Sequence, residues 1–172
     1  MIEDHWQRIA GIHKKPNGEI AAVWLARDPD TDVVRVYDAC LFKKEVLAVI
    51  AEGLNARGRW VPISWKDKEL AAALDERGCN MSPDCSDEND VMAELISRDM
   101  MERMRTGRFR VVDRLKEWVD EYTSFNKSQG KVPTDSHPLM AATRHAMAQL
   151  HDALAAKTRN LGSKNYPKLA II

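Results

Sequence analysis

Three strand-like segments follow one another at the start of the chain, separated only by short turns. They cover residues 6–13, 20–27 and 33–42. The turns between them, KKPNGE at 14–19 and DPDTD at 28–32, are rich in residues that favour chain reversal. Strands joined by such short connections pair antiparallel, because a parallel pair needs a crossover of a dozen or more residues. The sequence therefore predicts a three-stranded antiparallel meander.

A helix and a further strand are expected after the meander. Residues 43–57 carry apolar side chains at helical spacing and end before Gly58, and residues 60–64 read as a short strand. A strand reached through a helical crossover lies parallel to an earlier one. Helices are then expected at 67–77 and 90–106. The order β-β-β-α-β-α resembles the ribonuclease H-like α/β fold, a mixed sheet flanked by helices.

The second half of the chain is expected to be mainly helical, and it shows no sign of a second domain. We assign residues 1–156 to one domain and 157–172 to a basic C-terminal tail. The remaining segments are a polar loop at 79–90, an extended piece at 109–112, an amphipathic helix at 115–122, a polar excursion or hairpin at 126–136, and a long helix at 139–154.

Composition excludes several classes of protein. No stretch approaches the roughly 20 apolar residues of a membrane span, and the N-terminus lacks the pattern of a secretory signal, so we expect a cytoplasmic protein without a membrane partner. Cys40, Cys79 and Cys85 have no CxxC spacing, which disfavours zinc and disulfides. No GxxxxGK[ST] motif occurs, so we expect no ATP site in this chain.

The overall charge is balanced, with 26 basic and 26 acidic residues. Any contact with DNA must therefore come from a local basic patch. One basic stretch stands out, and it has two interpretations: a surface for duplex DNA, or a solvated helix end with no binding role. Its candidate DNA-binding residues are Arg103, Arg105, Arg108 and Arg110.

Several segments, in order over about residues 8–150, resemble the nuclease domain of phage terminase large subunits. They are AAVWLARDPDTDVVRVYDA at 21–39, GRWVPISW at 58–65, GCNMSPD at 78–84, DMMERMRTGR at 99–108, LKEWVDEY at 115–122 and LMAATRHA at 139–146. The resemblance implies an enzyme that cuts phage DNA during packaging with two magnesium or manganese ions. It also implies aspartate ligands at the end of the first strand, at the end of the fourth, and before the last helix.

The chain departs from the family pattern at all three places. His13, Lys68 and His137 stand where the resemblance implies catalytic carboxylates. The acids that could substitute are Asp67 and Asp135, each displaced along the chain from the family position. Magnesium prefers oxygen ligands, and an ammonium group repels a dication. We therefore expect no bound metal, or magnesium or manganese if activity remains.

Two functions stay open from the sequence. In the first, the chain is a catalytically inactive homologue that binds duplex DNA or a phage packaging protein. In the second, it is an active divalent-metal-dependent endonuclease with a rearranged site. The ligands would then be His13, Asp67, Asp135 and His137, with Glu19 as a further candidate, and this mixture would suit manganese, zinc or nickel better than magnesium. A decayed prophage remnant without a present role is a third, weaker interpretation.

Overall fold

The predicted meander is confirmed almost residue for residue. A computed structural model describes residues 1–83, 89–125 and 132–156 of the protein. Strand β1 (Gln7–Lys14) pairs antiparallel with β2 (Ile20–Arg27), which pairs antiparallel with β3 (Val34–Phe42). The pairing of β2 with β3 shifts register between Trp24 and Leu25.

Parallel strands extend the meander on both sides. Strand β4 (Ile63–Ser64) pairs parallel with β1, as the crossover predicts. Strand β5 (Phe109–Val111) pairs parallel with β3 at the far edge, which gives the order β4-β1-β2-β3-β5. The predicted mixed sheet and ribonuclease H-like fold class are confirmed.

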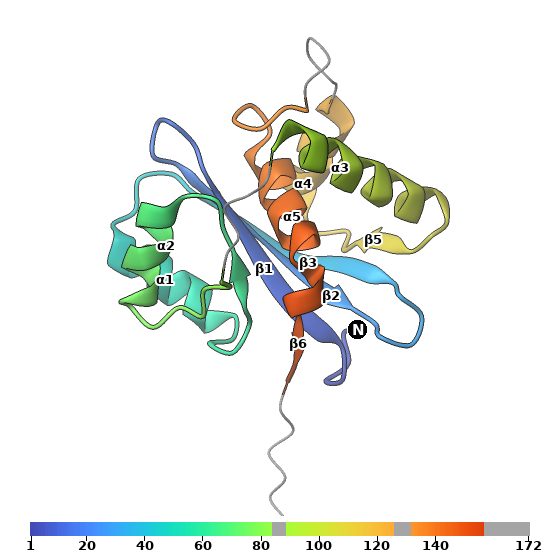
Figure 1. Ribbon diagram of the computed structural model, residues 1–172, viewed down its shortest axis with the longest axis horizontal. Coiled ribbons are helices and arrows are strands. Elements are labelled where there is room, and N and C mark those ends of the chain that lie inside the picture. Colours follow the sequence, from blue (N-terminus) through green and yellow to red (C-terminus); the bar gives the residue numbers. More distant parts are fainter. Residues whose placement is uncertain (84–88, 126–131, 157–172) are drawn as a thin grey trace, which may run out of the picture.

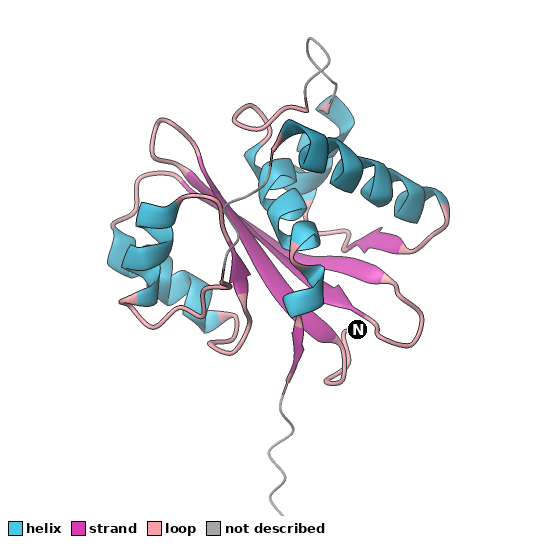
Figure 2. Cartoon of the chain, viewed as in Figure 1, coloured by secondary structure: helices cyan, strands magenta, loops and turns pink. Residues whose placement is uncertain are grey.

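Helices cover both faces of the sheet (Figures 1 and 2). Helices α1 (Leu47–Ala56) and α2 (Lys68–Asp75) lie on one face. Helices α3 (Asp90–Arg105), α4 (Lys116–Ser124) and α5 (Pro138–Ala148) lie on the other. None of the helices in the described parts of the chain is both long and apolar enough to cross a lipid bilayer.

Alternation along β1 divides its side chains between the two cores. Ile9 packs in the core under α3, α4 and α5, whereas Ala10 and Ile12 pack in the core under α1 and α2. Gly11 faces α5, where an added Cβ would lie 2.0 Å from the carbonyl oxygen of Ala142. Glycine at this position therefore lets the backbone of α5 rest directly on the centre of the sheet.

The helix predicted at 139–154 is confirmed up to Ala148 and wrong beyond that residue. Helix α5 ends at Ala148, and a 3-10 turn (Leu150–Asp152) leads into strand β6 (Leu154–Ala155). Strand β6 pairs antiparallel with β1 at Gln7 and Arg8, beside the stretch of β1 that pairs with β4. This pairing gives backbone groups at the start of β1 hydrogen-bond partners. The stabilisation from this contact between distant parts of the chain outweighs the local apolar pattern that favours a helix. The tail predicted at 157–172 and most of the excursion predicted at 126–136 lie outside the described residues.

Candidate functional site

The C-terminal end of β1 places His13 between two other polar side chains. Its imidazole is largely buried, with 10% of the side chain exposed. The Nε2 atom lies 3.0 Å from Oδ1 of Asp135, and the Nδ1 atom lies 3.3 Å from Nε2 of His145 on α5. Ser64, at the end of β4, donates a hydrogen bond of 2.6 Å to the carbonyl of His145. The ends of β1 and β4 therefore lie side by side, and His13 contacts Asp135 from the segment before α5.

The hydrogen-bond partners assign the tautomer of His13. An ionised carboxylate only accepts, so Nε2 of His13 carries a hydrogen and donates it to Asp135. The Nδ1 atom of a neutral ring is then the acceptor for the Nε2–H of His145. Burial lowers the pKa of His13, although the hydrogen bond that His13 donates to Asp135 raises it, and the net lowering favours the neutral ring. Both ring nitrogens are consequently engaged in hydrogen bonds, and a metal ion could bind His13 only by displacing one of these partners.

Asp67 has a structural task at the start of α2. Its Oδ1 accepts a hydrogen bond of 2.9 Å from the backbone N–H of Leu70, which makes it the N-cap of the helix. Its Oδ2 lies 3.5 Å from Nζ of Lys14. Asp67 therefore points a carboxylate at an ammonium group rather than at His13.

A pocket of about 260 Å³ lies between the end of β1 and the start of α2. We call it the β1–α2 pocket, and it is lined by Ile12, His13, Lys14, Lys66, Asp67 and Leu70. Lys68, which the resemblance places at a catalytic position, is the exposed first residue of α2. Among the described residues, Lys66 and Lys14 supply the ammonium groups of this pocket instead.

The remaining candidate ligands have other partners. His137 lies at the N-terminus of α5, where its Nε2 is 3.1 Å from the hydroxyl of Ser124 and its Nδ1 is 2.8 Å from that of Ser136. Glu19 accepts a hydrogen bond of 2.8 Å from Lys15 across the β1–β2 turn. The structure thus brings His13 and Asp135 into contact, places Asp67 on the same pocket, and directs His137 and Glu19 to other neighbours.

These residues do not fit a two-metal centre. Two hard cations need several oxygen ligands converging on one spot. Within residues 1–83, 89–125 and 132–156, the ligand atoms of three acidic, histidine or cysteine residues come within 4.8 Å of one another at His5, Asp28 and Asp30. That cluster lies at the opposite end of the β1–β2 pair, since Gln7 pairs with Arg27 and Lys14 with Ile20.

The arginines of the predicted DNA-binding patch are mostly engaged within the fold. Arg103 is only 12% exposed and pairs with Asp99 at 2.8 Å and with Asp32 at 3.1 Å. Arg108 lies 3.5 Å from the same carboxylate of Asp32. Asp32 has φ 56 and receives Arg27 as well, so these arginines fix the β2–β3 turn against the end of α3.

Two arginines of the patch are exposed to solvent. Arg105 forms paired hydrogen bonds of 2.7 and 2.9 Å with Glu102, one turn earlier on α3. Arg110, on β5, donates to the carbonyl of Gly107 at 3.2 Å. Their charges face water beside the edge strand, where an anionic partner could reach them.

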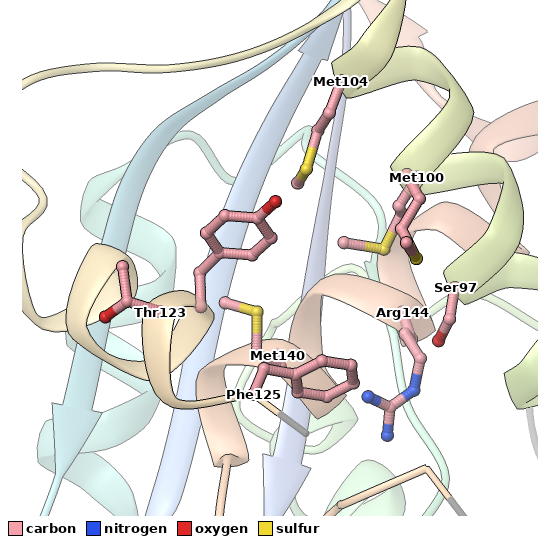
Figure 3. Close-up of a pocket in the computed structure, with 9 residues that line it drawn as sticks. Ser97, Met100, Met104, Thr123, Phe125, Met140 and Arg144 are labelled. Atoms are coloured by element: carbon pink, nitrogen blue, oxygen red, sulfur yellow. The ribbon is translucent and has the colours of Figure 1, made fainter. Parts of the chain in front are cut away.

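A second, more apolar pocket lies between α3, α4 and α5 (Figure 3). It has a volume of about 310 Å³ and is lined by Ser97, Met100, Met101, Met104, Tyr122, Thr123, Phe125, Met140 and Arg144. The methionines of α3 differ in burial. Met100 packs in the core, whereas Met101 is 65% exposed at the pocket.

Sequence reasoning missed the partners that define the site. His145 lies on the helix predicted at 139–154 and was not a candidate site residue, yet it is buried against His13. Lys14 belongs to the predicted turn at 14–19, Lys66 was not a candidate either, and both line the β1–α2 pocket. Alternation along β1 was the available signal. It directs His13 toward α5, where His145 lies, and Lys14 toward α2, where Asp67 lies.

Comparison with known proteins identifies the fold. No protein-family model and no curated protein matches the sequence. Among solved structures, the nuclease domain of the P22 large terminase superposes with a TM-score of 0.80 at 19% identity, covering 91% of this chain and 87% of that one. The manganese-bound nuclease domain of the large terminase of bacteriophage SPP1 gives 0.65 at 16% identity, covering 83% and 86%. The human cytomegalovirus terminase nuclease domain gives 0.56 at 10% identity, covering 87% and 85%.

These superpositions, together with the sheet order, assign the chain to the ribonuclease H-like fold class. More narrowly, the chain has the fold of the nuclease domains of large terminases, over nearly the full length of those domains.

Proposed function

We propose that this protein is a DNA-binding domain of the large-terminase nuclease type that does not cleave DNA by two-metal catalysis. The observation that carries the proposal is the state of His13, whose two ring nitrogens are both used in hydrogen bonds to Asp135 and His145. The next acid on the pocket, Asp67, is held by Lys14 and by the backbone of α2. Among the described residues, no group of three acidic, histidine or cysteine ligands within 4.8 Å of one another forms at His13, and this supports the absence of a two-metal site.

The fold supports DNA as the partner rather than a small molecule. The superposed domains belong to terminases, and the end of β1 lies at an open pocket with basic side chains. Exposed Arg105 and Arg110 provide a second basic surface on α3 and β5. Binding through such groups would be dominated by phosphate contacts and would weaken steeply with salt.

One observation favours the alternative of an active metal-dependent endonuclease. Of its four proposed ligands, His13 and Asp135 are already in contact, and Asp67 lines the same pocket as His13. A manganese ion could be held if Lys14 moved away from Asp67 and His13 gave up one hydrogen bond. The alternative therefore requires a rearrangement of two interactions.

Cleavage of supercoiled plasmid separates the two functions. The purified protein is incubated with magnesium or manganese, with the SPP1 large terminase nuclease domain as a positive control. We expect no nicking above the metal-free background. Metal-dependent nicking that disappears in both Asp67→Ala and Asp135→Ala would establish the alternative, because a contaminating nuclease would be unaffected by those substitutions.

DNA binding is measured separately, by fluorescence anisotropy of a labelled duplex at increasing salt. We expect binding at low salt and a steep loss as salt rises. If no binding occurs at 50 mM salt or below, the DNA-binding half of the proposal fails, and a packaging protein becomes the partner to seek.

A further inference from the structure

The β1–α2 pocket has the charge of an anion site rather than of a cation site. Two of its six lining residues are lysines, and Asp67 is its one acidic lining residue. His13 favours the uncharged form, because burial lowers the pKa of its ring even though the hydrogen bond to Asp135 acts in the other direction. Lys68, the first residue of α2, carries a further ammonium group.

We propose that this pocket binds a phosphate-type oxyanion directly, through the ammonium groups of Lys14 and Lys66 and without a metal ion. The inference rests on the proposed function in one respect only, namely that the oxyanion belongs to a DNA phosphate. Free inorganic phosphate offers the same chemistry, and the two sources are distinguished below.

The geometry of Asp67 prepares the pocket for this ligand. Because Oδ1 of Asp67 caps α2, its carboxylate is fixed in place, and its Oδ2 draws Lys14 toward the pocket at 3.5 Å. The ion pair is long and partly exposed, with 39% of Lys14 and 37% of Asp67 accessible, so little free energy is lost when Lys14 turns to another oxygen. Lys66 is exposed and lines the same pocket.

The remaining walls suit a tetrahedral oxyanion at the mouth and not an extended ligand. Ile12 and Leu70 close the inner side with apolar atoms, and the volume of about 260 Å³ holds one phosphate group with its water. An oxyanion seated there keeps its outer oxygens in solvent, where a phosphodiester continues into the nucleic-acid chain. The site therefore fits a backbone contact that carries no base specificity.

The test compares two double variants of equal charge in the intact protein. Lys14→Ala/Lys66→Ala removes both ammonium groups of the pocket. Arg59→Ala/Arg77→Ala removes two positive charges from the groove between α1 and α2, away from the pocket, and serves as the matched control. Thermal unfolding of each variant verifies that it is folded before binding is measured.

In the DNA arm, we expect the lysine variant to bind the labelled duplex roughly tenfold more weakly and to lower the slope of log affinity against log salt by about one to two. The arginine control should keep the slope of the wild type. An unchanged affinity and slope in a folded lysine variant would overturn the inference, even though DNA binding itself, and so the proposed function, would stand.

In the phosphate arm, inorganic phosphate is titrated into 15N-labelled protein and followed by NMR. We expect the amide signals of residues 12–14 and 66–70 to shift in the wild type and in the arginine control, and to stay fixed in the lysine variant. If the wild type binds phosphate there but not DNA, the pocket takes a free oxyanion and only the DNA proposal fails. If neither ligand shifts those signals, the inference is refuted.

Discussion

The Nδ1 atom of His13 lies 3.3 Å from the Nε2 atom of His145, a residue 132 positions further along the chain. This contact joins the end of β1 to the third turn of α5. With Asp135 at 3.0 Å on the other side, the three side chains form one continuous row of hydrogen bonds. That row needs a neutral His13 to accept from His145, so its stability depends on pH.

The first prediction concerns acid. Burial lowers the pKa of His13 below its ordinary value of 6.5, so the unfolded chain takes up the proton before the folded protein does. The contribution of His13 to stability is therefore complete above about pH 6.5 and is lost as the pH falls toward the folded pKa. Thermal unfolding at pH 8 and pH 5.5 should show a larger acid loss for the wild type than for His13→Gln, which does not titrate. Equal losses in the two proteins would contradict the neutral row.

The second prediction concerns a group whose contribution to stability is lost as the pH rises rather than as it falls. Glu121 on α4 accepts a hydrogen bond of 3.1 Å from the backbone N–H of Met140 at the start of α5, and burial raises its pKa to about 7. The folded protein thus keeps a proton that the unfolded chain loses near 4.5, and stability from this group is lost as the pH rises from 4.5 through 7.

Glu121→Gln removes the titration and keeps one oxygen acceptor for Met140. Because Glu121 is only partly buried, we expect the variant to gain about 1 kcal/mol over the wild type at pH 8, and less at pH 5. Urea unfolding at the two pH values measures the difference. A variant that is less stable than the wild type at pH 8 would show that the ionised carboxylate, as a helix cap, matters more than its burial.

The third prediction tests the close approach of α5 to the sheet. In Gly11→Ala the new methyl group would lie 2.0 Å from the carbonyl oxygen of Ala142 and 2.8 Å from the backbone nitrogen of Ala146, so the helix has to move. We expect a loss of about 3 kcal/mol or more, and a melting temperature lower by roughly 10 °C. Gly18→Ala is the comparison, because that turn glycine has open space and a φ of 88, and its replacement should lose only about 1 kcal/mol. Similar losses at both positions would mean that α5 does not pack as closely as described.

The sequence predicted the parts of this fold that depend on neighbours in the chain. The meander follows from two turns, and the N-cap at Asp67 follows from a short polar side chain before an apolar helix. Strand β6 was missed because its pairing with β1 is a contact between the two ends of the domain, and Leu154 continues the apolar spacing of the helix before it. Local pattern contains no information on that partner.

The sequence indicated which segments lie at the candidate site, but not which side chains contact one another there. Motif order placed the end of β1, the start of α2 and the segment before α5 together, and His13 does contact Asp135. The role of His145 depends on which turn of α5 faces β1, and the close approach of α5 at Gly11 sets it. The role of Lys14 depends on its contact with Asp67 at the start of α2. Those are tertiary facts, available only once the sheet is assembled.

The last prediction distinguishes an arginine that stabilises the fold from an arginine that binds DNA. Arg103 is largely buried, and it donates to the backbone carbonyl of Asp32 at 2.9 Å in addition to its ion pairs with Asp32 and Asp99. Arg103→Ala removes the arginine partner of that carbonyl and of Asp99, while the carboxylate of Asp32 keeps Arg27 and Arg108, and it should lower the free energy of unfolding by about 1–3 kcal/mol. Arg105→Ala, at an exposed pair with Glu102, should change it by less than about 0.5 kcal/mol. Below the melting temperature, the affinity for duplex DNA should fall in Arg105→Ala and stay unchanged in Arg103→Ala. If Arg103→Ala instead kept the stability of the wild type and bound DNA more weakly, Arg103 would contact DNA directly.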